Sequence, residues 1–95
     1  PKDTAGYNSQ LALSNQGHVN LIALSVLNHG ADLLGGRPLK PGESRRIDLP
    51  AGLSCCVDME IHFGGEYEPL VWNDLYICDA EMTLEPNNHF TVKSN

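Results

Sequence analysis

Residues 55–63 constrain the fold most strongly, because apolar and polar side chains alternate there without a break. In chain order the alternating positions are Cys56, Val57, Asp58, Met59, Glu60, Ile61, His62 and Phe63. Successive side chains of a β-strand point to opposite faces, so a period of two predicts a strand with one face in the core and the other in solvent.

A second strand is expected to return directly after this one. Gly64-Gly65 suits a tight hairpin turn, and residues 67–77 follow as the partner strand. Pro69 has no N–H to donate to a ladder, so the regular strand is expected to begin beyond it or to lie at an edge there.

Shorter apolar segments and turn residues divide the rest of the chain. Residues 19–27 (VNLIALSVL) also approach helical spacing, but nine residues bounded by glycine favour a buried strand in which Ile22, Leu24 and Val26 share a face. The remaining strands are expected at 10–14, 44–49, 81–85 and 89–93.

About seven short strands, with no helix longer than a turn or two, predict an immunoglobulin-like antiparallel β-sandwich. At 95 residues the chain has room for one domain. We assign residues 1–9 to an N-terminal extension and residues 10–95 to the sandwich.

The charge balance excludes several classes of partner. The chain carries 12 acidic and 6 basic residues, for a net charge of −6. Binding to nucleic acid or to anionic membranes requires clustered Lys and Arg, so neither is expected. No apolar run approaches the roughly 20 residues of a membrane span.

Residues 28–42 (NHGADLLGGRPLKPG) hold four glycines and two prolines, which predicts a long loop or a loop with one short turn of helix. Loops of this length in small domains are more often functional than short ones. Its candidate binding residues are His29, Asp32, Leu33, Leu34 and Arg37.

The three cysteines differ in their strand faces. Cys55 shares the apolar face of Val57, whereas Cys56 shares the polar face of Asp58. Cys78 ends the returning strand, so it can approach Cys55 within the 4.4–6.8 Å or so that a disulfide needs between Cα atoms. We therefore predict a Cys55–Cys78 bridge and a free Cys56, the alternative being three reduced thiols. A free Cys56 can be a passive thiol, a link to a second copy or a metal ligand.

The polar face of residues 55–63 contains a candidate metal site. Cys56, Asp58 and His62 combine a thiolate, a carboxylate and an imidazole, a set suited to zinc or copper. An alternating polar face is equally typical of any solvated strand. No nucleophile elbow or cysteine-protease motif occurs, so we expect no enzymatic activity and no cofactor.

For the returning strand, residues 67–77, the alternation does not decide which face points into the core. Trp72, Asp74 and Tyr76 alternate onto one face, and Leu75 and Ile77 onto the other. Packing of Trp72 in the core is favoured over an exposed aromatic strip for a partner.

Several of these segments together resemble a family of small, uncharacterised bacterial exported proteins. The resemblance rests on residues 33–49 (LLGGRPLKPGESRRIDL), Cys55-Cys56-Val57-Asp58, Trp72-Asn73-Asp74-Leu75 and Cys78. It implies a single exported β-sandwich in which these two cysteine positions pair, with no established activity. The chain departs from the family in its second cysteine, Cys56, and in showing no export signal in the sequence.

The sequence thus predicts a non-enzymatic binding or protein-interaction module, exported to an oxidising periplasmic or extracellular compartment. Its partner is expected to be another protein or a second copy added at a strand edge. The alternatives are a small zinc or copper protein and an intracellular acidic inhibitor of a basic target.

Overall fold

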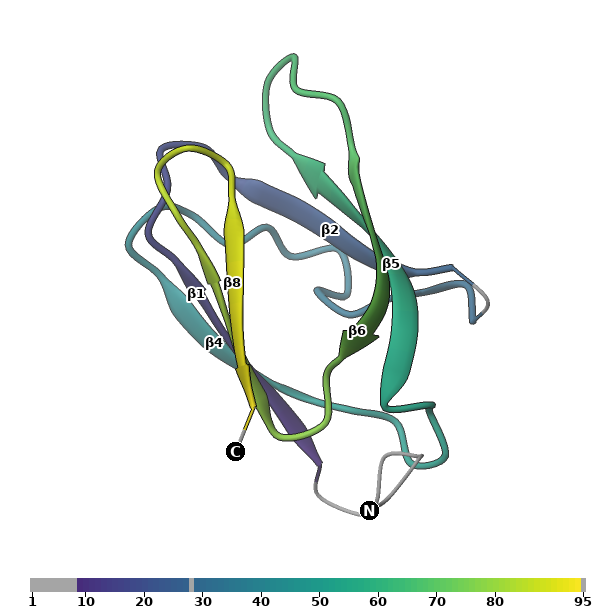
Figure 1. Ribbon diagram of the computed structural model, residues 1–95. Helices are drawn as coiled ribbons and strands as arrows, with labels where there is room; N and C mark the ends of the chain where they lie inside the picture. Colours follow the sequence, from purple (N-terminus) through teal and green to yellow (C-terminus); the bar gives the residue numbers. More distant parts are fainter. Residues whose placement is uncertain (1–8, 28, 95) are drawn as a thin grey trace.

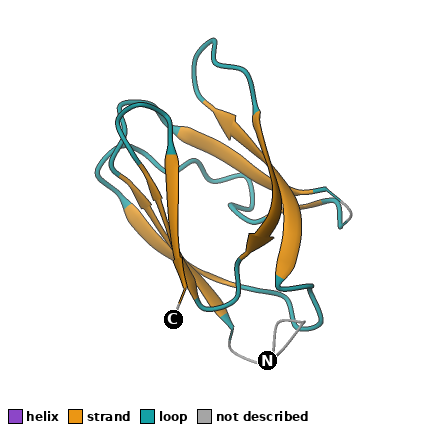
Figure 2. Ribbon diagram, in the orientation of Figure 1, coloured by secondary structure: helices purple, strands orange, loops and turns teal. Residues whose placement is uncertain are grey.

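The computed structural model describes residues 9–27 and 29–94, and these residues form eight β-strands and no helix (Figures 1 and 2). The strands are β1 (Gln10–Asn15), β2 (Leu21–Val26), β3 (Ala31–Asp32), β4 (Ser44–Asp48), β5 (Cys56–Phe63), β6 (Leu70–Tyr76), β7 (Ala80–Leu84) and β8 (Phe90–Ser94). Residues 1–8 of the expected N-terminal extension lie outside the described residues.

The described strands pack as two facing sheets, with the orders β4-β1-β7-β8 and β3-β2-β5-β6 (Figure 1). The β-sandwich expectation is confirmed, and β5 and β6 occupy the segments predicted for them. The connection between them, residues 64–69, is longer than the tight turn expected from Gly64-Gly65. Pro69 directly precedes β6, where its missing N–H costs no ladder hydrogen bond.

One strand pair departs from the antiparallel expectation, because β1 and β7 run parallel. After β1 the chain enters the second sheet, returns to the first for β4, leaves it again for β5 and β6 and comes back for β7, so β1 and β7 are not joined by a hairpin. The first two strands also lie in different sheets, whereas those of an immunoglobulin domain pair with each other.

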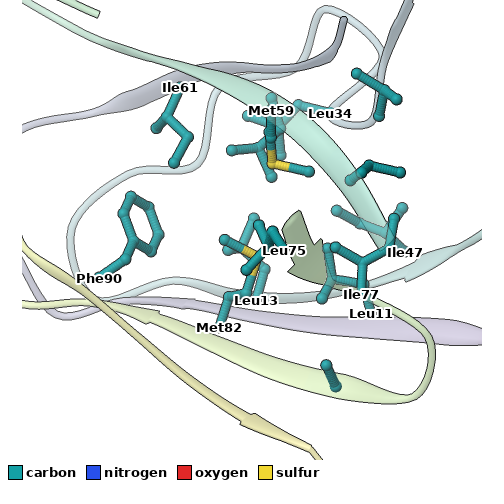
Figure 3. Packing of buried hydrophobic residues seen from close by; sticks show 14 of the residues in the cluster. Leu11, Leu13, Leu34, Ile47, Met59, Ile61, Leu75, Ile77, Met82 and Phe90 are labelled. Carbon is teal, nitrogen blue, oxygen red and sulfur yellow. The ribbon is translucent and has the colours of Figure 1, made fainter. Parts of the chain in front are cut away.

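The core fills the space between the two sheets. Figure 3 shows Met59 and Ile61 of β5 pointing toward Leu13 of β1 and Met82 of β7. Phe90 stacks on Phe63 with ring centroids 6.3 Å apart. The strict alternation of burial along β5 confirms the strand face predicted from the sequence.

Two β-bulges change which side chains reach this core. In β2 the pairing skips a residue between Leu21 and Ala23, so Leu21 and Leu24 are buried while Ile22 is exposed, and Ile22 does not share the face of Leu24 and Val26 as expected. Extra residues in one strand of a pair reverse the side-chain alternation beyond them.

In β6 the bulge lies between Trp72 and Leu75, which pair with Met59 and Val57. Trp72 packs against the core and Leu75 is buried, whereas Tyr76 is exposed. Trp72 is only partly buried, and the predicted core face of Trp72 and Tyr76 does not form, because the bulge separates the two residues and Leu75 and Ile77 of the other face are buried.

Asn15 is a fully buried polar side chain at the end of β1. Its amide nitrogen donates to the carbonyls of Val19 and Leu39, each at 2.9 Å, and its oxygen accepts the N–H of Gly17, also at 2.9 Å. These hydrogen bonds fix the β1–β2 connection against the loop that precedes β4.

We expect Asn15→Ala to lower the free energy of unfolding by about 2–4 kcal/mol, because it leaves the buried Leu39 carbonyl and Gly17 N–H without this partner. Urea denaturation followed by tryptophan fluorescence measures the change. Ser14→Ala, on the neighbouring outward position, is the control and should stay within roughly 0.5 kcal/mol of wild type. Equal losses in the two variants would contradict this role of the amide.

A disulfide joins Cys55, just before β5, to Cys78, just after β6, with a Cα–Cα distance of 5.2 Å. Both cysteines are buried, as the strand face of Cys55 predicted. Beside the bridge, the N–H of Ile77 donates to the carbonyl of Cys55 at 2.8 Å, so the base of the β5–β6 hairpin is closed twice.

Removing the bridge with Cys55→Ala/Cys78→Ala should lower the free energy of unfolding by about 3 kcal/mol, the amount expected from releasing a closed loop of this length. The matched control is Cys56→Ala, which removes an exposed thiol and keeps the bridge. A double variant as stable as wild type in chemical denaturation would be inconsistent with a stabilising bridge.

Candidate binding site

A pocket of about 320 Å³ lies where β5 begins, between the end of β2 and the bulge of β6. Buried apolar side chains of Val26, Leu53 and Val57 form part of its lining. Polar side chains complete the lining, namely those of His29, Ser54, Cys56, Asp58 and Asp74. The pocket therefore offers apolar surface and carboxylates within one small volume.

The bulge in β6 brings the two carboxylate residues together. Asp74 has a φ of 54°, in the left-handed region that Asp tolerates better than most residues. Its N–H donates to Oδ1 of Asp58 at 3.0 Å, which satisfies a backbone donor that the bulge removes from the ladder. Asp58 therefore holds the bulge in place, and the bulge holds Asp74 at the pocket.

Cys56 is free and exposed at the edge of this pocket. Its N–H donates to the hydroxyl of Ser54 at 3.3 Å, and that hydroxyl donates to the Cys56 carbonyl at 2.8 Å. The two contacts fix the backbone of Cys56 and leave its thiol without a role in the fold.

The predicted metal site is not assembled. Cys56 and Asp58 line the pocket, but His62 lies further along β5, where its Nε2 is 2.7 Å from Oε1 of Glu60. Within residues 9–27 and 29–94, no three His, Cys, Asp or Glu side chains are placed to hold a metal ion. The shared strand face was predicted correctly, but six residues of extended chain keep Cys56 and His62 apart.

The expected binding loop contributes only part of its residues to a surface. Leu34 is buried in the core and Leu33 packs against it, so this prediction is wrong for Leu34. Asp32 organises the loop, because its carboxylate accepts the backbone N–H groups of Leu24, Leu34 and Gly36, each at 3.0 Å.

The two remaining loop candidates are exposed. Arg37 lies in the turn after β3, and its carbonyl accepts a hydrogen bond from Arg45 at 2.6 Å. Of the five loop candidates, His29 is the residue that lines the pocket. The structure thus brings His29 to Cys56 and Asp58, which the sequence had assigned to a separate site.

Asp74 was missed as a site residue. Alternation assigned it to the face of Trp72, whereas the bulge turns it to the pocket. The adjacent pair Asn73-Asp74 was the available indication, because both residue types are disfavoured in regular strands.

A larger hollow, of about 470 Å³, lies on the sheet formed by β4, β1, β7 and β8. Its charged side chains are those of Arg45, Arg46, Glu81 and Lys93, and Glu81 is directly across from Lys93 in the register. Arg45, which also lines it, donates to the carbonyls of Arg37 and Pro38. None of the site residues predicted from the sequence lines this hollow, so it is a weaker candidate than the pocket at β5.

Next to the pocket, β6 forms one edge of its sheet and exposes apolar side chains. In the described chain, four of the six exposed large hydrophobic residues belong to β6 or the connection before it, namely Tyr67, Leu70, Val71 and Tyr76. That connection projects beyond the sandwich at the top of Figure 1.

The other three edges of the described sheets are protected against strand addition. β3 has only two residues, β4 carries Arg46, and β8 carries Lys93. Short strands and basic side chains are common devices against edge-to-edge pairing. On β6 the bulge interrupts pairing at Asp74, which leaves the stretch from Leu70 to Trp72 as an open, apolar edge.

Comparison with protein-family models, with curated proteins and with solved structures gives no match to this chain. The described residues include no helix long and apolar enough to cross a membrane. The disulfide suggests an oxidising environment, since such bonds are rare in reducing cytosol.

Native protein treated with iodoacetamide should take up one carbamidomethyl group, on Cys56, because the other two cysteines are bridged. Intact mass spectrometry measures the uptake, and Cys56→Ser should take up none. Reduction in denaturant before alkylation should raise the count to the full three cysteines. Labelling of Cys55 or Cys78 in native, unreduced protein would contradict the pairing.

Proposed function

We propose that the protein is a non-enzymatic interaction module of an exported, oxidising compartment, and that β6 pairs with an extended segment of a partner protein. The observation that carries this proposal is the open edge from Leu70 to Trp72. Among the described edges it is the one that exposes apolar side chains without a Lys or Arg to oppose strand addition. A partner strand would gain ladder hydrogen bonds along β6, while its side chains contact Leu70 on one face of the sheet and Val71 on the other.

The disulfide supports both parts of the proposal. It fits an exported location, and it anchors the hairpin that presents the edge. A preorganised edge binds with a smaller entropic cost than a flexible one, because less motion is lost on association.

The two alternatives have less support. A zinc or copper protein needs a set of ligands that the described residues do not bring together. An intracellular inhibitor would fold in a compartment where the Cys55–Cys78 bridge is disfavoured.

The proposal predicts that Val71→Asn weakens partner binding by about tenfold, because it removes exposed apolar surface worth about 1.4 kcal/mol to the complex. Peptides are selected from a displayed random library against wild-type protein, and their dissociation constants are measured for both proteins. Binding should shift the backbone amide resonances of residues 70–72.

Thr91→Asn on the edge strand β8 is the matched control, because Thr91 is also exposed and the substitution introduces the same residue. It should leave peptide binding unchanged. Selected peptides that bind Val71→Asn as tightly as wild type, or that shift the resonances of another surface, would rule out β6 as the binding edge.

A further inference from the structure

We propose that the pocket at the start of β5 receives a lysine or arginine side chain of the segment that pairs with β6. The inference rests on the interaction function proposed above and specifies the chemistry of the partner. It is argued from the lining of the pocket, its unmatched charge and its position at the end of the open edge.

The lining fits a side chain that is apolar along its stem and cationic at its tip. Val26, Leu53 and Val57 supply apolar surface, and Asp58 and Asp74 supply carboxylates. Lys and Arg bury their methylene groups against apolar surface while the charged head stays near polar groups. At about 320 Å³ the volume is at the small end of ligand pockets, which suits one long side chain.

The carboxylates at the pocket have no cationic partner within the described chain. No Lys or Arg lines the pocket, and no described ion pair involves Asp58 or Asp74. Asp58 uses Oδ1 to accept the Asp74 N–H, and the Asp74 carboxylate accepts no described hydrogen bond. The net charge of −6 adds to the attraction for a cation.

The position of the pocket connects it to the open edge. Asp74 belongs to β6 and follows the stretch from Leu70 to Trp72, and the bulge turns it to the pocket. A partner strand running along that stretch reaches the bulge, where regular pairing stops. A long side chain at that point of the partner can leave the ladder and enter the pocket, which gives the partner sequence a fixed basic position.

The first test uses N-acetyl-lysine N-methylamide as the probe and records amide resonances of the whole protein during titration. We expect shifts at Ser54, Asp58 and Asp74, with no comparable shifts from the norleucine analogue, which has the same stem without the charge. The variant Asp58→Asn/Asp74→Asn should bind the lysine probe at least about tenfold more weakly, because the amides keep the hydrogen bond and the left-handed residue but lose both charges.

Glu66→Gln/Glu68→Gln is the matched control, because it removes the same two charges from the neighbouring connection, outside the pocket. It should bind the lysine probe as wild type does. Equal binding of the probe and its norleucine analogue, or equal weakening in both double variants, would overturn the proposal. If Asp58→Asn/Asp74→Asn is not folded, the salt dependence of probe binding to wild type decides. The affinity of a charge-driven contact falls strongly between about 0.05 M and about 0.5 M NaCl, because the added salt screens the charges.

A second test separates this inference from the function on which it rests. Selected peptides that bind β6 are remade with their basic residue replaced by norleucine, and we expect binding to weaken about tenfold or more. Peptides that remain sensitive to Val71→Asn but tolerate norleucine would overturn the pocket assignment and leave the edge function standing. A lysine probe in the pocket, with peptide binding indifferent to Val71→Asn, would overturn the link to a strand-adding partner.

Discussion

The β5–β6 hairpin depends on the Cys55–Cys78 disulfide, because β6 has a neighbouring strand on one side only. The bridge closes the base of the hairpin at the point where the chain leaves for β7 in the facing sheet. It therefore fixes the ends of β5 and β6, two neighbouring strands of one sheet, and keeps an edge strand in place without a second partner. The bulge and the open edge lie within the segment that the bridge encloses, and that segment supplies part of the lining of the pocket.

Much of this framework could be predicted from the sequence, because it depends on local alternation. The faces of β5, the inward Cys55 and the outward Cys56 all follow from a period of two. The bulges could not be predicted in this way. Whether a residue is skipped in β2 or β6 depends on the register against β5, which involves residues far away in the chain. This is why Ile22 was grouped with Leu24 and Val26, and Trp72 with Tyr76.

For the same reason, only part of the candidate site could be predicted from the sequence. Cys56 and Asp58 were expected on one face, and the pocket confirms that they share a surface. Asp74 and His29 reach them only through a bulge and a loop, which alternation does not describe. Leu34 looked like a loop residue because glycines surround it, yet the carboxylate of Asp32 folds that loop back onto the sheet and buries the leucine.

The uneven protection of the edges sets the stoichiometry of any complex made by strand addition. A molecule with one edge open to strand addition binds one partner strand. Among the described strands that edge is β6, so a second partner strand finds no further edge to pair with. On the facing sheet, Arg46 and Lys93 oppose the addition of further strands to β4 and β8. Such a molecule can cap another protein's sheet and end its extension, whereas a sandwich with two open edges would propagate into fibres.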